Sequence, residues 1–420
     1  MSTFGENFLT DRPDLMASII ASHTLYEDRR QLPYESIEVL GNGRFGSVDK
    51  VVRKPNTSDD DYIHVQKPNT PDDGYIYARK AIAFRNKRSR ILLHDAINKE
   101  VNILKSVNHL HAVRLVETYL CGREYGMIMV PAADRNLAEY LEDTASISLP
   151  DPYIPQWFGC LVSGLAYLHE RNIIHHDIKP HNILCHGGNI LFADFGISRT
   201  FEGDTLTIST NPSGTTRYWA PEVGKGQRAG RRSDVFSLGT IFLEMIAVIS
   251  RQTIEQLNIS RGGSYSENLR KVLPWMKELC LDPGYLDDYW YPPVKFLCSE
   301  MLKESRDDRP YANMLKACWE HSPSLVMPPS LCECIVQALD LLDTENRELG
   351  MSHNIKQRAK DLIRGVVSSR NKTPIMGEHE WSMTQWIWPH QDQEASLDSW
   401  NIDLMFNAEA EVKPPSDSGE

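Results

Sequence analysis

Two short polar segments, His175–Asn182 and Asp194–Gly196, constrain this chain more than any other part of its sequence. The first reads His-His-Asp-Ile-Lys-Pro-His-Asn, and the second begins twelve residues after the first ends and reads Asp-Phe-Gly. Together they supply four polar side chains: Asp177, Lys179, Asn182 and Asp194. A carboxylate can accept a proton, a lysine can neutralise a phosphate, and carboxylate and amide oxygens suit Mg²⁺. This is the equipment of phosphoryl transfer, in which positioning and charge neutralisation supply most of the catalysis.

The first of these segments, taken alone, leaves a plain structural interpretation open. His-Asp pairs and turns that contain asparagine are common on protein surfaces. The second segment at this spacing favours catalysis, because two separate loops then carry complementary groups.

A glycine-rich segment follows the first predicted strand. Residues 36–40 alternate like a strand, Gly41, Gly43 and Gly46 come next, and a second predicted strand continues to Val52. Glycines at this spacing let the backbone approach a phosphate where a Cβ atom would collide. A dinucleotide-binding fold would continue into a helix. A strand follows here, which favours a flap over ATP.

The next segment contains a short internal repeat. Residues 54–63 reappear as residues 67–76, an offset of thirteen residues. Two copies are too few for a solenoid, so we interpret them as a tandem duplication of a loop between strands. The copying creates two candidate phosphate-binding lysines. Lys80 leads into an apolar run, whereas Lys67 is followed by Pro68, which ends a strand, so we select Lys80.

A helix is predicted over residues 94–107, where apolar residues recur at helical spacing. Glu100 lies beside this apolar stripe, twenty residues past Lys80. It is either the ion-pair partner that holds Lys80 in place or an ordinary exposed glutamate.

The remaining elements are predicted from periodicity. They are strands at 112–120 and 125–130, an extended connection at 131–133, helices at 137–142 and 153–171, a hairpin at 183–192, and mostly helix over 234–321. Beyond residue 323, amphipathic helices are predicted at 331–342 and 355–366.

Charge is concentrated at the carboxyl-terminal end. Residues 376–420 contain ten acidic side chains and one basic one, and so carry −9 of the net charge of −12. The nearly neutral remainder does not favour a nucleic-acid-binding protein, which needs a basic face. The acidic end also contains four tryptophans: Trp381, Trp386, Trp388 and Trp400. This mixture indicates a disordered tail that binds a partner or the chain itself, although a packed extension stays open.

Other features bound the class of protein. The eight cysteines include no paired Cys-x-x-Cys motifs, so a zinc site is not favoured. The polar, acidic first ten residues do not resemble a secretory leader. The longest apolar run, residues 235–249, is shorter than the ~20 residues that span a bilayer. We therefore expect an intracellular protein, cytoplasmic or nuclear, with reduced thiols and no membrane span.

From residue 36 to residue 321 the chain resembles the eukaryotic protein kinases. The motifs occur in the order of that family: Gly41, Gly43 and Gly46; Lys80 with Glu100; His175–Asn182; Asp194–Gly196; Ala220–Glu222; Asp234; and Arg309. A lysine followed by proline, at Lys179 and Pro180, is typical of the serine/threonine branch.

The resemblance implies an α+β, bilobal fold. We expect a loosely held N-terminal arm at 1–33, a small β-rich lobe with one main helix at 34–130, a hinge at 131–136 and a larger helical lobe at 137–322. A helical extension at 323–371 and the acidic, Trp-rich tail at 372–420 would follow.

The resemblance also implies roles for single residues. Asp177 would accept the proton of a serine or threonine hydroxyl on a protein substrate, Lys179 would contact the γ-phosphate, and Lys80 with Glu100 would complete the catalytic set. Asn182 and Asp194 would bind Mg²⁺. The ATP-contacting residues would be Leu40, Gly41, Asn42, Gly43, Gly46, Val48, Ala78, Lys80, Met129, Val130, Ala132 and Leu184.

Further residues would support the active state. Asp234 would brace the catalytic loop, Arg309 would pair with Glu222, and Thr215 would help to close the substrate loop. An apolar column would be formed by four residues: Leu104, Leu115, His175 and Phe195.

One residue departs from the family pattern. His176 stands where most members carry an arginine before the catalytic aspartate, and that arginine is a permanent cation that grips a phosphate on the activation loop. Histidine has an ordinary pKa of ~6.5 and is mostly neutral at pH 7. We therefore expect little dependence on phosphorylation of the loop hydroxyls at Thr205, Thr207, Ser209 and Thr210.

Two other classes of protein share this core. A catalytically dead scaffold would usually have lost a lysine, an aspartate or a metal ligand, and none is lost here. A small-molecule phosphotransferase would lack the segment 214–222, which cradles a peptide. A separate adaptor function of the Trp-rich tail stays open.

Overall fold

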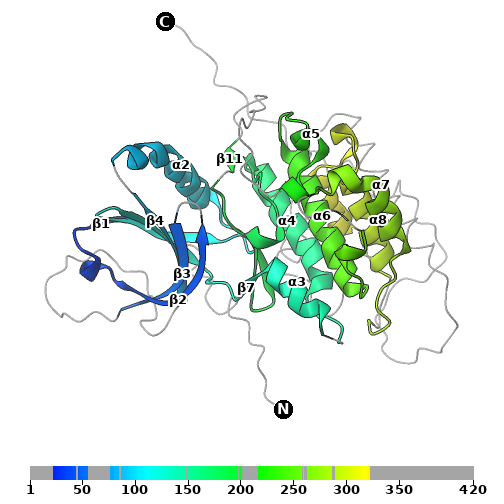
Figure 1. Cartoon of the computed structure of the whole chain (residues 1–420), viewed down its shortest axis with the longest axis horizontal. Coiled ribbons are helices and arrows are strands. Elements are labelled where there is room, and N and C mark those ends of the chain that lie inside the picture. Colours follow the sequence, from blue (N-terminus) through cyan, green and yellow to red (C-terminus); the bar gives the residue numbers. More distant parts are fainter. Residues whose placement is uncertain are drawn as a thin grey trace, which may run out of the picture. The chain divides into compact units, whose positions relative to one another are not determined.

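The structure is a computed structural model that describes residues 22–43, 46–54, 76–84, 87–147, 149–196, 198–200, 216–257, 259, 263–285 and 289–321 (Figure 1). Several predicted features lie outside these residues. They are Lys67 with most of the repeated loop, the activation-loop hydroxyls, Thr215, the helical extension and the acidic tail.

Contacts within the chain define two compact units. The first unit comprises Met1–Glu142 and Tyr167–Thr205, and the second comprises Asp143–Ala166 and Leu206–Glu420. This division falls after Glu142 rather than at the predicted hinge, and it groups the two catalytic segments with the sheet. The predicted lobe boundaries stay a prediction.

The first unit is built on a six-stranded sheet with the order β1-β5-β6-β4-β3-β2. Its strands are β1 (Ser22–Tyr26), β2 (Tyr34–Gly43), β3 (Gly46–Arg53), β4 (Ile76–Ala83), β5 (Arg114–Cys121) and β6 (Glu124–Val130). All neighbours are antiparallel except β1 and β5. The helix α2 (Lys87–Ser106) packs against β5 (Figure 1). It begins seven residues before the predicted start.

The strand β1 corrects one expectation. The sequence analysis treated residues 1–33 as a loosely held arm, and this is wrong for the described part of it. β1 pairs in parallel with β5, and Leu32 and Tyr34 are buried with Tyr77 and Tyr119 on the sheet. The edge of β5 offers unpaired backbone groups, and the neighbouring aromatic rings offer an apolar surface. By packing there, the segment gains backbone hydrogen bonds and buries its apolar side chains.

The two catalytic segments lie among short strands in the rest of the first unit. These elements are β7 (Arg135–Asn136), β8 (Ile173–Ile174), the 3₁₀ turn η2 (Pro180–Asn182), β9 (Ile183–His186), β10 (Asn189–Phe192) and β11 (Arg199–Thr200). β9 and β10 form the predicted hairpin. The end of β10 is tied to the chain just before β5, because Phe192 N donates to His111 O at 2.9 Å and Val113 N donates to Phe192 O at 3.0 Å. The hairpin is thereby fixed within the unit that contains the sheet.

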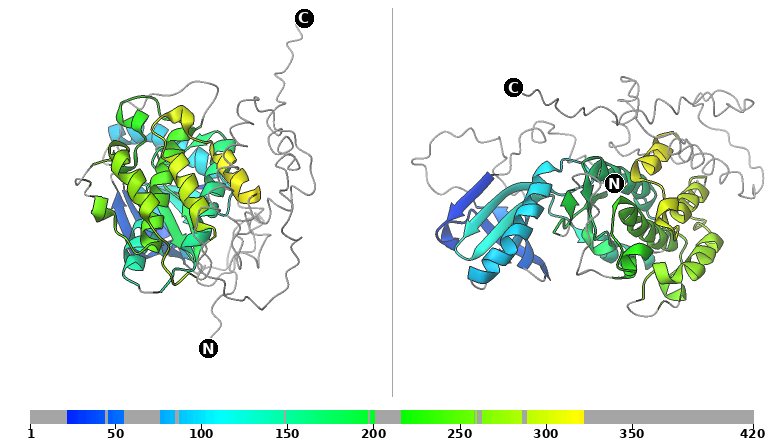
Figure 2. Two further views of the ribbon diagram at one scale, coloured as in Figure 1. Left: turned by 90° about the vertical axis from the view of Figure 1, so that its right-hand side faces the viewer. Right: turned by 90° about the horizontal axis from the view of Figure 1, so that it is seen from above.

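The second unit is helical. Its helices are α5 (Pro221–Gly224), α6 (Arg231–Ile249), α7 (Leu269–Glu278), α8 (Tyr291–Met301) and α9 (Ala312–His321). Two more helices are divided between the units: α3 (Leu137–Ala145) begins in the first unit and ends in the second, and α4 (Ile154–Glu170) begins in the second and ends in the first. Short 3₁₀ turns, η3 (Thr216–Tyr218) and η5 (Ser266–Asn268) among them, connect these helices. α6 packs against α7, α8 and α9 (Figure 2).

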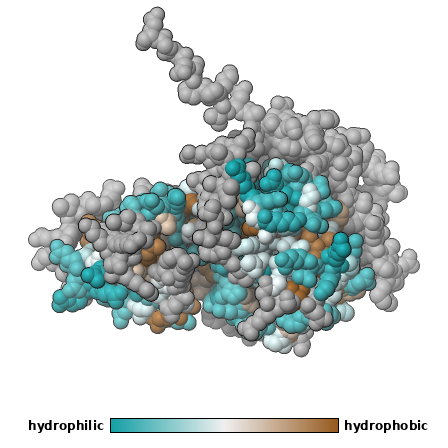
Figure 3. Space-filling view, turned by 45° about the horizontal axis from the view of Figure 1, so that its top comes forward, coloured by the Kyte–Doolittle hydropathy of each residue, from teal (hydrophilic) through white to brown (hydrophobic). Residues whose placement is uncertain are grey.

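α6 is the central helix of the second unit. Most of its side chains are buried, as expected for a helix that is apolar on all sides. This confirms the prediction of a core helix for residues 235–249. Within the described residues, no helix is both long enough and apolar enough to cross a bilayer. On the face shown in Figure 3, hydrophilic residues cover most of the described surface and apolar residues form small separate spots.

An ion pair deep in the second unit joins α5 to the chain before α9. The Nη1 atom of Arg309 lies 2.9 Å from Glu222 Oε1, and its Nη2 atom donates to Glu222 Oε2. Arg309 is 0 % exposed and also donates to the carbonyls of Lys303, Glu304 and Arg232. Burial by itself would raise the pKa of the Glu222 carboxyl, but Arg309 and Ser233 outweigh burial and hold the pKa below its ordinary value. The predicted pairing of these two residues is confirmed.

Arg309→Ala is expected to lower the free energy of unfolding by about 3–5 kcal/mol, because it leaves a buried carboxylate without its partner. The matched control is Arg306→Ala, whose side chain is 37 % exposed and pairs only at the surface with Asp307. Urea denaturation of both variants measures the difference, and equal small losses would contradict this role. Since the pKa of Glu222 is depressed, the stabilisation is present above its ordinary pKa and is lost as the pH falls through its folded value.

Candidate active site

Lys80 lies in the middle of β4, where its neighbours across the sheet are Val48 on β3 and Met127 on β6. Its Nζ atom lies 2.6 Å from Glu100 Oε1 on α2 and 3.0 Å from Asp194 Oδ1. Strand β4 fixes the backbone of Lys80, and the two carboxylates fix the position of its Nζ atom. One lysine therefore joins the sheet, the helix and the Asp-Phe-Gly segment.

Two members of this cluster, Lys80 and Asp194, keep their charges. Burial by itself would lower the pKa of the Lys80 ammonium, but Glu100 and Asp194 outweigh it and hold the pKa above its ordinary value. Burial raises the pKa of the Glu100 carboxyl, against the opposing effect of Lys80. For Asp194, burial is outweighed by Lys80, with smaller contributions from His175 and Lys179, and the pKa is lowered. Lys80 is therefore a cation at neutral pH, and Asp194 is an anion.

Asp177 is held by its own loop. Lys179 Nζ lies 2.7 Å from Asp177 Oδ2, and the amide Nδ2 of Asn182 donates to the same oxygen at 2.9 Å and to Asp177 O at 2.8 Å. The side chain of Asp177 is only 12 % exposed. The carboxylate is thus set in one orientation beside a cation. Because Lys179 also lowers the pKa of Asp194, the two aspartates share one electrostatic environment.

His175 connects the two segments. Its buried ring donates from Nε2 to Ala193 O at 3.0 Å, and Nδ1 accepts from Asp177 N at 3.3 Å. The His175 ring also contacts Phe195, with 5.2 Å between centroids. The four residues of the expected apolar column are all buried: Leu104, Leu115, His175 and Phe195.

Two residues here have unusual backbone angles. His176 has a φ of 68° and Asp194 a φ of 60°, both in the left-handed region that residues with a Cβ rarely adopt. Such conformations cost on the order of 1–3 kcal/mol and persist where the surrounding structure imposes them. Both residues adjoin the hydrogen bonds that orient Asp177 and Asp194.

A metal ion would find a suitable set of donors in the first unit. The Nδ2 atom of Asn182 is used in the two bonds to Asp177, so its amide oxygen is the atom that can serve as a ligand. The side chain of Asp194 is 51 % exposed and offers a carboxylate. Mg²⁺ typically takes one or two protein oxygens and completes its shell with phosphates and water. Across the described parts of the chain, no cluster of three or more His, Cys, Asp or Glu side chains could hold a metal alone.

The residues expected to contact the nucleotide lie on five strands of the first unit and on the connection after β6. Leu40, Gly41, Asn42 and Gly43 are on β2, Gly46 and Val48 on β3, Ala78 on β4, Met129 and Val130 on β6, Ala132 after β6, and Leu184 on β9. Gly46 has a packing role, since a Cβ atom there would lie 1.8 Å from Ala81 O. A Cβ at Gly41 would meet nothing within 4 Å, so space at that position stays open for a ligand.

One supporting residue was missed in the sequence analysis. The Oγ atom of Ser198 donates to His175 O at 3.0 Å and ties the chain after Asp194–Gly196 to the catalytic loop. A lone serine carries no sequence signal for such a bond. The brace expected from Asp234 stays a prediction, because Asp234 belongs to the second unit.

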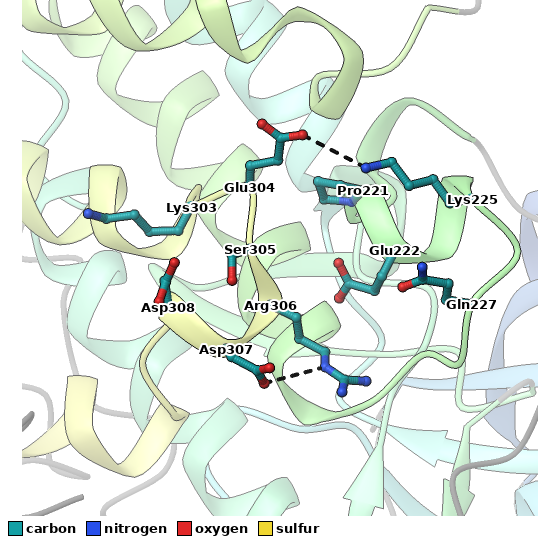
Figure 4. A pocket seen from close by; sticks show the side chains of 10 residues that line it. All are labelled: Pro221, Glu222, Lys225, Gln227, Lys303, Glu304, Ser305, Arg306, Asp307 and Asp308. Atoms are coloured by element: carbon teal, nitrogen blue, oxygen red, sulfur yellow. Dashed lines mark ion pairs between the residues drawn. The ribbon is translucent and has the colours of Figure 1, made fainter. Parts of the chain in front are cut away.

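The second unit contains a cavity of about 580 Å³ that is unrelated to these groups (Figure 4). Its lining mixes acidic and basic side chains from α5 and from the chain between α8 and α9. Lys225 pairs with Glu304 at 3.8 Å, and Arg306 pairs with Asp307 at 3.9 Å. With most of its charges paired and no predicted catalytic residue in its lining, this cavity does not offer the chemistry of the first unit.

Comparisons with known proteins place the chain in a family. Residues 61–320, more than half of the chain, match the protein kinase domain. The matched range begins after Gly41, Gly43 and Gly46, so it does not cover the glycine-rich segment. Serine/threonine-protein kinase nekl-2 of Caenorhabditis elegans is 28% identical over 243 residues, which are 56% of this chain and 62% of that protein.

Two further relatives have similar identities. Serine/threonine-protein kinase TIO of Arabidopsis thaliana is 31% identical over 50% of this chain and 14% of its own length. The CaM kinase-like vesicle-associated protein of Xenopus laevis is 28% identical over 53% of this chain and 58% of its own length. The chain thus spans less than two thirds of each of these relatives. By its matched domain, the chain belongs to the protein kinase family, and the relatives named above include two serine/threonine-protein kinases.

Proposed function

We propose that this chain transfers the γ-phosphoryl group of ATP to serine and threonine hydroxyls of protein substrates. The observation that carries the proposal is that Lys80 donates hydrogen bonds to both Glu100 and Asp194. In the same unit, Lys179 and Asn182 donate hydrogen bonds to the carboxylate of Asp177. Family membership supports ATP as the donor.

The residues support a balanced reaction. The substrate oxygen forms a bond to the γ-phosphorus as the bond to the β-phosphate oxygen breaks, and ADP leaves. The hydroxyl proton passes to Asp177, which accepts it as a general base. Lys179 and Lys80 offset charge on the phosphates. Mg²⁺, held by Asn182 and Asp194, would neutralise further phosphate charge when bound.

The test is incubation of the full chain with Mg·ATP and a degenerate peptide array, followed by identification of the labelled amino acid. We expect label on serine and threonine. Binding of Mg·ATP without any transfer would contradict the proposal and favour a kinase-like scaffold. Label on a small molecule but on no peptide would favour the other class of phosphotransferase.

Activity is expected to depend little on phosphorylation of the activation loop, because His176 supplies no permanent cation. Phosphatase treatment should therefore lower the activity by much less than 100-fold. A larger loss would contradict the prediction, since ordering by a paired phosphate is worth one to three charge-assisted hydrogen bonds. The matched variant His176→Arg restores the cation and should become more sensitive to the same treatment.

We also propose an intracellular location and an interaction role for residues 372–420. Their acidic, Trp-rich composition supports the second proposal. Truncation after Lys372 should keep peptide phosphorylation and lose a binding partner in a pull-down. An unchanged set of partners would contradict it.

A further inference from the structure

Arg217 lies in η3, within the segment 214–222 that the sequence analysis assigned to peptide binding. Its backbone and its side chain both contact one tyrosine. Tyr265 N donates to Arg217 O at 2.9 Å, and the guanidinium carbon lies 4.9 Å from the centre of the Tyr265 ring. The Nη2 atom of Arg217 donates to Tyr265 Oη at 3.4 Å. The side chain of Tyr265 therefore contacts the guanidinium of Arg217, and the backbone N–H of Tyr265 holds the Arg217 carbonyl.

The tyrosine beneath the guanidinium is itself fixed. Tyr265 is 0 % exposed and donates its hydroxyl to Glu244 Oε1 on α6 at 2.5 Å. The hydroxyl of Tyr218 donates to the same oxygen at 3.1 Å, and Ser237 Oγ donates to Tyr218 O at 2.8 Å. A chain of hydrogen bonds thus runs from the guanidinium through Tyr265 to the buried helix α6. Arg217 is anchored before any ligand arrives, which reduces the entropy lost on binding.

Most N–H donors of the Arg217 guanidinium make no hydrogen bond to the described residues. An arginine carries five N–H donors, and among the described residues the Arg217 guanidinium makes a single long hydrogen bond and no ion pair. Burial by itself would lower the pKa of this group, but Tyr265 and Glu244 raise the pKa above its ordinary value, so the cation persists. Glu244 Oε1 is already occupied by two tyrosine hydroxyls. The side chain of Arg217 is partly exposed, so a ligand can reach the free donors.

A fixed, partly exposed guanidinium is suited to a particular chemistry. Its planar fork matches the two oxygens of a carboxylate or of a phosphate, and such charge-assisted pairs are stronger than neutral hydrogen bonds. A purely structural role, in which Arg217 only covers Tyr265, would need the apolar stem and the ring contact but not the free donors.

We propose that Arg217 determines substrate specificity by binding an anionic side chain, carboxylate or phosphate, of the protein substrate. This inference rests on the proposed function. It names the substrate class as acidic or previously phosphorylated serine- and threonine-containing segments. Arg217 acts on binding and takes no part in the transfer of the phosphoryl group.

The test is a positional peptide array in which each position around the acceptor is varied among Asp, Glu, phosphoserine, Ala, Lys and Arg. The wild-type chain should prefer an anion at one position by about tenfold or more in kcat/KM, mainly through KM, as expected for one charge-assisted pair. The ratio of Asp and Glu to phosphoserine at that position distinguishes the two sources of the anion.

Arg217→Glu should reverse the preference, so that Lys and Arg become favoured at the same position. Arg217→Gln should abolish it with little change in kcat, and this variant serves if the charge reversal prevents folding. The matched control is Arg228→Glu, which makes the same charge change at an exposed residue of the same unit and should keep the anion preference.

The outcomes separate this inference from the proposed function. Peptide phosphorylation without any anion preference in the wild type, or a preference that Arg217→Glu and Arg217→Gln leave intact, overturns the inference alone. The proposed function then still stands. Absence of label on every peptide overturns the proposed function, and this inference with it.

Discussion

Asp177→Asn is expected to lower phosphoryl transfer to peptides by about 100- to 10,000-fold, the usual contribution of a general base. The amide keeps the shape of the carboxylate, so Asn182 keeps a neighbour of the same size. It cannot accept the hydroxyl proton, and it leaves Lys179 without the anion that lies 2.7 Å away. Initial rates of peptide labelling at saturating Mg·ATP measure the effect.

The matched control is Asp95→Asn, the same isosteric change at an α2 side chain that is 86 % exposed. Both variants should bind ATP like the wild type, because neither removes Lys80 or Asp194. A variant at Asp177 that retained more than about a tenth of the activity would show that the carboxylate does not take the proton. Loss of folding is excluded when both variants unfold at the same urea concentration.

The sequence could predict the parts of the site that follow from short-range patterns. Lys80 was selected from its neighbours in the chain alone, because an apolar run continues a strand and a proline ends one. The hairpin of β9 and β10 and the core helix α6 follow in the same way from alternation and from length. The structure adds that Glu100 faces Lys80, which decides between the two interpretations that helical spacing left open.

Long-range contacts could not be predicted in this way. β1 is five residues long and pairs with residues 95 positions away, so nothing in its own pattern reveals the partner. The bond from Ser198 to His175 O and the stacking of Arg217 on Tyr265 depend on how distant segments pack. Neither leaves a periodic signal, since single serines and arginines occur throughout the surface of most proteins.

Lys80→Met and Lys67→Met are expected to differ by about 100-fold or more in peptide phosphorylation, with Lys80→Met the inactive variant. Loss of Lys80 leaves the buried carboxylate of Glu100 unpaired and removes the cation that lies 3.0 Å from Asp194. Removing one preorganised electrostatic group from an active site usually costs on the order of 10²–10³ in rate. Steady-state assays of both variants against the same peptide measure the difference.

The internal repeat makes Lys67 a well-matched control for Lys80. Each lysine follows a Tyr-Ile pair and three further residues, so the two differ chiefly in what comes after them. Ala81 continues β4, where it pairs with Ser47 and Gly126, whereas Pro68 has no N–H to donate to a strand. An active Lys80→Met with an inactive Lys67→Met would mean that the first copy forms the catalytic strand. The pairing of β4 with β3 and β6 argues for the second copy, because only the second copy leads directly into Ala81–Ala83.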